Sequence, residues 1–495
     1  MRMSKLLKKS GSLIALLLAA IMLLSACGGA DTSSTESKAD SADSSQSESV
    51  LGETSTEDKI DNASDTQSAA QDTSKQNNAG QNVQTQSNKT TWEKDYLSTI
   101  PAAVKAKEIH ILMWRTFDEP EQKLVDEFKK RTGIKIRTTI TPEQEYTTKL
   151  ISLISGGDSP DIVFVSTDTF PGVVTKCCLP LDEKVYRLDD PAWYKPYMDC
   201  YKVNGRYFSV AMNKSPSCED TNHMVYYLKS TLKACGISTT PWQLYKQGKW
   251  DWEAQNDIVI KASAKGITGL SMHSYDTYMQ STGNGFVKYD GKQFTNNMDN
   301  PTVLKSWTNF ANVTSSGEVT SWDYKNIAAG RVALFTSIAY QGFKVSKVFK
   351  NEKGEPTVQG GIENIECVPI AGPTQSTAYT PVMAKSWANP KGSKNPEGAA
   401  YFLRFFLDVS NTDYENLFHN NQIKEVYNTI CDRKAKKQIT YEKGVVSFTN
   451  KDLYKNIVTE LKFATPANIK QKLDSHKKTI NAPIKQANNA LSRIK

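Results

Sequence analysis

One stretch of the sequence, residues 108–165, predicts the fold of the domain. It opens with EIHILMW (108–114), a mostly apolar run typical of a short buried strand, and it closes with PDIVFV (160–165), which predicts another strand. Between them, residues 134–140 alternate like a strand, and residues 119–131 and 142–154 carry apolar side chains at helical spacing. Strand, helix, strand, helix, strand within about 60 residues predicts a parallel sheet with right-handed crossovers, the core of an α/β fold.

Polar side chains follow the first and third of these strands, in WRTFD (114–118) and STDT (166–169). Because parallel sheets bind ligands beyond the carboxyl ends of their strands, Trp114, Asp118 and Asp168 are candidate ligand-binding residues. Each also has a purely structural interpretation. The tryptophan could belong to the core, and each aspartate could cap the helix that follows it.

An export signal precedes this domain. The first nine residues include the basic side chains of Arg2, Lys5, Lys8 and Lys9. Residues 13–24 then form an uncharged apolar run of about a dozen residues, which is too short for a membrane span of roughly 20. The run ends in LLSAC (23–27), which resembles the bacterial lipobox, where the cysteine is acylated and becomes the mature N-terminus. We therefore expect residues 1–26 to be a lipoprotein signal peptide. Cys27 would then carry the lipid (palmitate is expected) that holds the protein on the outer face of the cell membrane, as in Gram-positive bacteria. The alternative is an ordinary secretory signal with a chance cysteine.

Residues 27–91 predict a tether. Beyond Cys27 this segment holds no aromatic side chain, and serine, threonine, aspartate, glutamine and asparagine fill most of it. Such a segment buries too little apolar area to offset the entropy of ordering it, so we expect a disordered coil with a reach of roughly 40 to 45 Å. The alternative is a pro-segment, although no cleavage signature is visible.

Charge and cysteine usage exclude several function classes. The net charge is +8, but the lysines are scattered, so we expect a basic surface at an anionic cell wall and no nucleic-acid partner. Seven cysteines follow Cys27, an odd number that cannot form a complete disulfide framework, and we expect most of them to be small buried hydrophobes. The five histidines lie far apart and no cysteine pair shows CxxC spacing, so no metal or cofactor is predicted.

A series of short motifs along the domain resembles the family 1 extracellular solute-binding proteins of ABC importers, the class that includes maltose-binding protein. The motifs are FKKRTGIKI (128–136), GDSPDIV (157–163) with LPLD (179–182), NGRY (204–207), YYLK (226–229) with ACGI (234–237), LYKQGKWDW (244–252), AGRVALF (329–335) and KNPEGAA (394–400). The sequence departs from the family near the first hinge segment, where the family usually has a proline at the position of Val210 or Ala211 and an asparagine at that of Leu228.

The resemblance implies a two-lobed periplasmic-binding-protein fold of class II within residues 92–495. Lobe 1 is expected at about 100–210 and 370–412, and lobe 2 at about 213–367 and 413–495. The chain would cross between the lobes near residues 209–213, 367–372 and 408–416. The ligand would lie between the lobes, and hinge closure would present the loaded, monomeric protein to the permease subunits of an ABC transporter.

A sugar has hydroxyl rims and apolar faces, so a sugar cleft needs flat aromatic rings together with carboxylates and amides. The resemblance and the strand ends together select these candidates: Trp114, Asp118, Asp168, Tyr275, Tyr278, Tyr340 and Tyr379. The last of these, Tyr379, precedes a returning strand that is expected at Thr380–Ala384. A carbohydrate, and among carbohydrates an oligosaccharide, is thus the expected ligand, with peptides or anionic solutes as alternatives.

Two other functions use the same residues differently. A sensor or adhesin could share the fold and bind a ligand without transport. A tethered glycoside hydrolase would need two carboxylates flanking a scissile bond, and Asp118 with Asp168 is the only pair that suggests itself. The sequence holds no GxSxG elbow, HExxH pair or phosphate loop, so we expect no enzyme activity.

Overall fold

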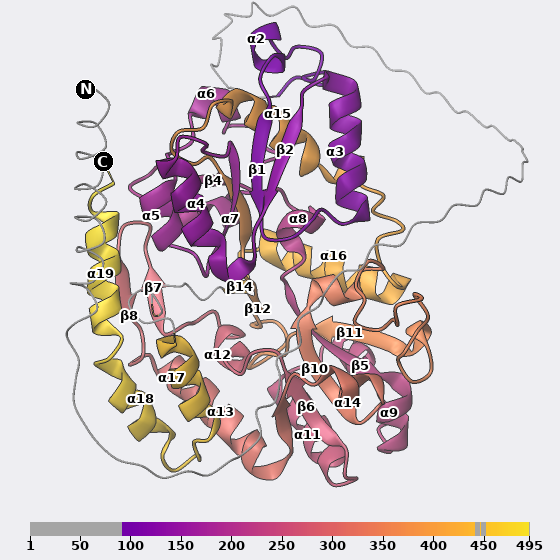
Figure 1. The fold of residues 1–495 in the computed structure, drawn as a ribbon. Helices are drawn as coiled ribbons and strands as arrows, with labels where there is room; N and C mark the ends of the chain where they lie inside the picture. Colours follow the sequence, from indigo (N-terminus) through magenta and orange to yellow (C-terminus); the bar gives the residue numbers. More distant parts are fainter. Residues whose placement is uncertain (1–91, 441–445, 447–451, 495) are drawn as a thin grey trace, which may run out of the picture. The chain divides into compact units, whose positions relative to one another are not determined.

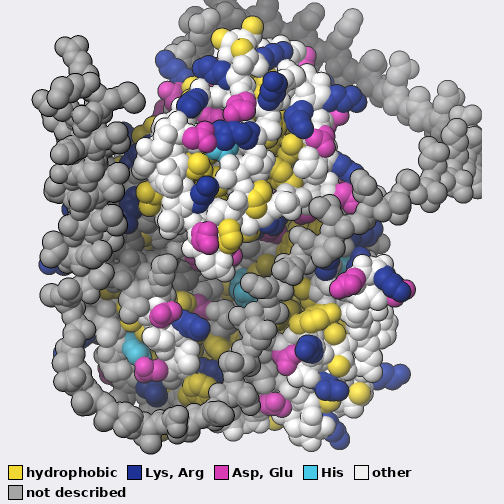
Figure 2. All heavy atoms as spheres, in the orientation of Figure 1, with side chains coloured by type: hydrophobic (Ala, Val, Ile, Leu, Met, Phe, Trp, Pro, Cys, Tyr) yellow, Lys and Arg dark blue, Asp and Glu magenta, His cyan; other side chains and the backbone are white. Residues whose placement is uncertain are grey.

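The computed structural model describes residues 92–440, 446 and 452–494. The predicted signal peptide, Cys27 and the tether lie outside the described residues. The described part runs from α2 (Ala102–Lys105) to α19 (Asn481–Leu491) and contains two five-stranded sheets (Figure 1). None of its helices combines the length and apolar character needed to cross a membrane. On the face seen in Figure 2, Lys and Arg side chains are dispersed among Asp and Glu, as the scattered lysines of the sequence predict.

The first sheet confirms the predicted α/β core. Strands β1 (Ile109–Met113), β2 (Ile136–Ile140) and β3 (Ile162–Ser166) are parallel and lie in the order β2-β1-β3. Two strands from later in the chain, β13 (Lys385–Ala388) and β4 (Ser209–Val210), continue the sheet, with β13 antiparallel to both neighbours. Every residue of β1 and β3 is buried, as the continuous apolar runs predict for strands covered on both faces.

The helices around this sheet begin and end where the sequence predicts. Helix α3 (Glu119–Thr132) starts at Asp118 with a capping box and stops at Gly133, whose φ of 74° lies in the left-handed region that glycine adopts readily. Phe128 of α3 packs edge-on against Phe402 of α15 (Pro396–Phe406). The second predicted helix forms as a short 3-10 turn, η1 (Glu143–Glu145), followed by α4 (Tyr146–Ser155).

The second sheet is mixed and buried on both faces. Its strands, in spatial order, are β11 (Ile365–Pro369), β5 (His223–Leu228), β10 (Val332–Ile338), β6 (Thr268–Met272) and β9 (Val319–Ser321). Along β5, Val225 and Tyr227 face a core shared with α11 (Trp252–Ser263) and α13 (Pro301–Ser316). Met224, Tyr226 and Leu228 face a separate core, closed by α16 (Asn421–Ala435). Alternate side chains of β5 point to opposite faces of the sheet and thus pack into two different hydrophobic cores.

Three chain segments connect the parts built on the two sheets, which we call lobe 1 and lobe 2. Residues 211–222 lead from β4 to β5 and contain α8 (Pro216–Glu219), residues 370–384 lead from β11 to β13, and residues 407–420 lead from α15 to α16. These segments overlap the predicted crossings. A strand over Thr380–Ala384 was also predicted, and this is wrong: β12 covers only Thr380–Pro381, where it pairs with β14 (Ile439–Thr440), and the returning strand is β13.

The C-terminal helices contact elements of both lobes. Helices α17 (Leu453–Lys462) and α18 (Ile469–Lys477) pack on α13, whereas α19 packs on β8 (Phe294–Asn296) and on α5 (Gly172–Cys177) (Figure 1). The side chain of Asn488 in α19 bonds both the backbone N–H and the carbonyl of Phe294, at 2.7 and 3.0 Å. The hairpin formed by β7 (Val287–Tyr289) and β8 is thereby fixed to the C-terminal helix.

Short elements complete the fold. They are α6 (Glu183–Tyr186), α7 (Lys195–Met198), η2 (Asp199–Tyr201), α9 (Lys229–Ala234), α10 (Pro241–Lys246), α12 (Thr277–Gln280), α14 (Tyr324–Ala328), η3 (Ala339–Gly342), η4 (Ile362–Asn364) and η5 (Val409–Asn411). All seven cysteines after Cys27 are buried and free of disulfides, which confirms their expected role as small apolar side chains.

Candidate functional site

A narrow groove lies where the carboxyl end of β1 meets residues of the second lobe. Lobe 1 lines it with Arg115, Asp118 and Glu121, and lobe 2 lines it with Tyr340 and Phe343. Its cavity volume is about 30 Å³, which is room for about one water molecule. A solute of sugar size therefore enters this groove only when the two walls separate.

Asp118 serves both the fold and the groove. Its carboxylate accepts a hydrogen bond from the N–H of Glu121 at 3.1 Å, and its own N–H donates to the Glu121 carboxylate at 3.1 Å. The capping role considered from the sequence is thus confirmed, and the same carboxylate lines the groove. Burial, followed by the nearby Glu121 charge, raises the pKa of Asp118 to about 6, against the opposing pull of Arg115.

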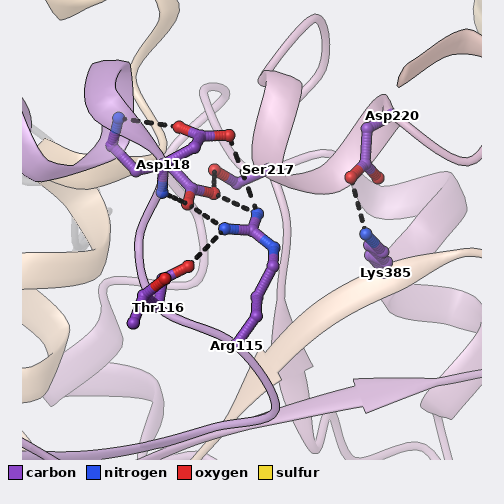
Figure 3. A network of polar contacts seen from close by, with 7 residues as sticks. Arg115, Thr116, Asp118, Ser217, Asp220 and Lys385 are labelled. Carbon is purple, nitrogen blue, oxygen red and sulfur yellow. Dashed lines mark hydrogen bonds and ion pairs between the residues drawn. The ribbon is translucent and has the colours of Figure 1, made fainter. Parts of the chain in front are cut away.

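Arg115 is held by its carboxylate neighbours (Figure 3). Its two terminal nitrogens bond the two oxygens of Glu121 at 2.7 and 2.9 Å, and it lies 3.9 Å from Asp118. The hydroxyl of Ser217, from the first crossing, donates to Glu121 at 3.2 Å. A bidentate pair of this kind fixes the plane of the guanidinium, so the groove carries an oriented array of donors and acceptors before any solute arrives.

A buried ion pair lies at the groove, formed by one residue that lines it and one from β13. The ammonium of Lys385 lies 2.6 Å from the carboxylate of Asp220, and the two side chains are 8% and 9% exposed (Figure 3). The same ammonium lies 5.2 Å from the centre of the Trp114 ring. The carbonyl of Asp220 accepts from the N–H of Tyr340 at 2.8 Å. This pair therefore connects β13 of lobe 1, the first crossing and the tyrosine of lobe 2.

Trp114 and Tyr340 differ in how freely they present their rings. Trp114 is half-buried and packs against Phe164 with ring centres 4.1 Å apart, so the core interpretation holds for part of its surface. Tyr340 is half-buried in η3 and lines the groove. Burial raises the pKa of Tyr340, and the negative charge of nearby Asp118 adds to the rise.

Asp168 belongs to a second group of predicted residues. It is exposed in the loop after β3, and it does not cap a helix, because α5 begins only after Pro171. Although the side chain of Asp168 reaches solvent, the protein crowded around this loop desolvates its carboxyl group and raises its pKa to about 6, and repulsion from Glu143 and Asp276 contributes. Asp276 directly precedes α12 of lobe 2, so part of this repulsion comes from a carboxylate of the other lobe.

The three remaining tyrosines lie near α12, with different exposure. Tyr275 is half-buried, and its hydroxyl is 2.5 Å from that of Ser321. Tyr379 is also half-buried, and its ring lies against Gly283, where an added Cβ would come within 2.9 Å of the ring. Tyr278 is only 3% exposed, and its hydroxyl is satisfied by Gln255 at 2.7 Å and by Asn256 at 2.9 Å. Tyr278 is thus a core residue, and its predicted place on the cleft surface is corrected.

The structure also adds residues that sequence reasoning missed: Arg115, Glu121, Ser217, Asp220 and Lys385. A signal existed for two of them, because Arg115 follows Trp114 directly and Glu121 stands three residues after Asp118, the spacing of a capping box. Asp220 and Lys385 lie 165 residues apart, and no local pattern joins them.

Two α/β lobes, three connecting segments and a polar, aromatic groove between them define a two-lobed solute-binding protein. Residues 123–414, more than half of the chain, match the family of bacterial extracellular solute-binding proteins, and the chain belongs to this family. The resemblance inferred from the motifs is thereby confirmed. A search of curated protein sequences gave no match.

Solved structures show the same fold at low sequence identity. The galacto-N-biose-/lacto-N-biose I-binding protein of an ABC transporter from Bifidobacterium longum is 14% identical, with a TM-score of 0.55 over 77% of this chain and 97% of that one. The sugar-binding protein MalE from Xanthomonas citri is 13% identical, with a TM-score of 0.55 over 78% and 98%. An extracellular solute-binding protein from Staphylococcus aureus in complex with maltose is 11% identical, with a TM-score of 0.56 over 77% and 98%.

Proposed function

We propose that this protein is the receptor of an ABC importer that captures a carbohydrate, an oligosaccharide by preference, and delivers it to the permease. The observation that carries the proposal is the groove in which Asp118 and Arg115 of lobe 1 face Tyr340 of lobe 2. Carboxylate and guanidinium groups pair with sugar hydroxyls, and an aromatic ring stacks on the apolar face of a sugar. The structural neighbours named for sugars support this choice of ligand.

Closure follows from the placement of the polar groups on two lobes. A sugar that contacts both walls stabilises the closed arrangement by its differential affinity for the two states. Asp168 and Tyr379 extend the proposed site beyond the groove, together with Trp114 and Tyr275. The predicted lobe boundaries, at about 100–210 with 370–412 and 213–367 with 413–495, are part of this proposal, as is a monomeric protein anchored through Cys27.

The proposed protein binds its sugar without altering it. The carboxylate of Asp118 is engaged by Glu121 and flanked by Arg115, so it is committed to structure and binding. Asp168 lies in the loop after β3, where Glu143 and Asp276 are its charged neighbours. This distribution supports a binding protein over a hydrolase, which needs two carboxyl groups across one scissile bond.

A thermal-shift screen tests the proposal. The purified full-length protein is heated with a panel of mono- and oligosaccharides, and with peptides and small anions as other solute classes. A saccharide at about 100 times its Kd should stabilise the protein by about 2.7 kcal/mol and raise the Tm, and the saccharide should be recovered intact. Stabilisation by peptides alone, or turnover of the saccharide, would contradict the proposal.

A further inference from the structure

Arg433, in the last turn of α16, is a buried cation that has no anionic partner among the described residues. Arg433 is 7% exposed, and one of its terminal nitrogens, Nη1, is buried without a hydrogen-bond partner in the part of the chain that the structure describes. The other, Nη2, donates to the carbonyl of Gln375 at 3.2 Å. No carboxylate of the described residues lies within ion-pair distance of the guanidinium. A buried charge in this state is unfavourable unless something compensates it.

The guanidinium lies in the wall of a hollow on lobe 2. The hollow has a volume of about 580 Å³ and is formed by the end of α16, by the second crossing and by the turn between α10 and α11. Arg433 lies 5.5 Å from the centre of the Tyr245 ring, which offers a cation only weak compensation. Burial lowers the pKa of Arg433, and the Tyr245 hydroxyl opposes this effect only in part, with no contribution from a carboxylate of the described residues.

The two acidic residues of the hollow do not supply the missing charge. Asp251 uses its carboxylate to cap α11, accepting from the N–H of Ala254 at 3.0 Å. Asp432 is exposed to solvent and forms no ion pair with Arg433 among the described residues. The hollow is also lined by Lys436, Thr374 and Ser376, which supply an ammonium and two hydroxyls. Two cations and two hydroxyls thus surround the empty space.

We propose that this hollow is a second ligand site, which binds a small oxyanion through Arg433, Lys436 and the hydroxyls of Thr374 and Ser376. A planar guanidinium suits both carboxylate and phosphate oxygens, and this shared chemistry defines the ligand class. The site is separate from the groove at Tyr340. Part of the LYKQGKWDW motif (244–252) lines it, through Tyr245, Gly248 and Asp251.

The bound anion would brace the second crossing. Gln375 accepts from the N–H of Trp250 at 3.0 Å, donates to the carbonyl of Tyr245 at 2.9 Å and receives Arg433 on its own carbonyl. Neutralising the guanidinium strengthens the position of this glutamine, which lies in the segment that joins the lobes. An anion in the hollow therefore stabilises the segment about which the lobes move.

Calorimetric titration of the full-length protein tests the site, with inorganic phosphate and acetate as separate probes and chloride at matched ionic strength as the reference. We expect saturable binding of at least one oxyanion and a loss of affinity of tenfold or more in Arg433→Gln. Arg331→Gln, which removes an exposed arginine elsewhere on lobe 2, should bind like the wild type. Binding of phosphate without acetate, or the reverse, identifies which oxyanion the site takes.

A second pair of variants keeps the test decisive if Arg433→Gln fails to fold. Ser376 is exposed, so Ser376→Glu places a negative charge at the rim without disturbing the core, and Ser376→Gln is its neutral counterpart. The glutamate variant should lose the anion, whereas the glutamine variant should keep most of the affinity. The proposal is overturned if neither oxyanion binds the wild type beyond the chloride reference, or if Ser376→Glu and Ser376→Gln bind equally well.

Discussion

Lys434 and Glu219 form an ion pair in which both side chains are completely buried. Glu219 ends α8 in the first crossing, and Lys434 lies in α16, which follows the third. The Glu219 carboxylate also accepts from Asn222 at 2.8 Å, and the ammonium of Lys434 donates to the hydroxyl of Tyr197 at 3.2 Å. The pair therefore joins the first connecting segment to α16 of lobe 2, with a tyrosine of lobe 1 beside it.

Removing one partner of this pair should be strongly destabilising. Lys434→Met leaves the Glu219 carboxylate buried and unpaired, and we expect a loss of about 3–5 kcal/mol in the free energy of unfolding, measured by urea denaturation. The double variant Glu219→Gln with Lys434→Met should lose less, because no buried charge remains. The exposed pair of Lys261 with Asp257 is the control, and Lys261→Met should change stability by less than about 1 kcal/mol. Equal losses at the buried and the exposed pair would refute this reading.

Tyr340 should contribute to sugar affinity through its ring. Tyr340→Ala removes the stacking surface, and we expect a loss of about 1–3 kcal/mol in binding free energy, measured by titration calorimetry with the saccharide found in the thermal screen. Tyr340→Phe keeps the ring and should retain most of the affinity. Unchanged affinity in the alanine variant would remove Tyr340 from the site.

Asp168 should make stability depend on pH. Its pKa is raised to about 6 in the folded protein, above the value near 3.9 of an unfolded chain, so the folded state binds the proton more tightly. Stability should therefore rise as the pH falls from above 6 towards 4, and ionisation should cost stability above pH 6. Asp168→Asn should raise the Tm at pH 7.5, and its advantage should shrink as the pH falls below 6. Because this side chain is exposed, solvent screening keeps the effect small. A Tm difference that is constant between pH 4 and 8 would argue against the assignment.

Gly283 should tolerate no side chain. Its φ is 78°, and a Cβ would lie 2.9 Å from the ring of Tyr379, so Gly283→Ala combines backbone strain with a clash. We expect a loss of about 1–3 kcal/mol in the free energy of unfolding. Gly291→Ala is the matched control, because its φ is 91° and nothing lies within 4 Å of the added Cβ. If the two alanine variants lose the same free energy of unfolding, the contact with the Tyr379 ring does not contribute to the loss.

Cys27 should hold the protein at the membrane. Cys27→Ser removes the thiol that is acylated in a lipobox, and the protein should move from the membrane fraction to the medium, as followed by immunoblotting of both fractions. Cys178→Ser, at a buried cysteine of the domain, is the control and should leave the distribution unchanged. A serine variant that stays in the membrane fraction would reject the anchor.

Sequence periodicity was a reliable guide to lobe 1. The strands of residues 108–114, 134–140 and 160–165 and the helices between them form within a few residues of their predicted bounds, because each is a local pattern of apolar side chains that a single sheet buries. The strand predicted at Thr380–Ala384 failed, since pairing with β14 takes its first two residues and the sheet takes Lys385–Ala388 instead.

The candidate site was only partly accessible to the same reasoning. The position after a strand end selected Asp118 and Asp168, and both lie in loops near the second lobe. Tyr278 was misassigned, because a loop tyrosine in the sequence gives no sign that Gln255 and Asn256 satisfy its hydroxyl inside the core.

The α/β core, the family and the loops at the ends of β1 and β3 could be predicted from the sequence alone, because these features depend on side chains close together along the chain. Which distant side chains meet could be learned only from the folded structure: Lys385 with Asp220, Lys434 with Glu219, and Arg433 with no carboxylate among the described residues. Such contacts form between segments that packing brings together from distant parts of the chain. Whether a buried charge finds a partner depends on the whole fold, so no local sequence pattern predicts it.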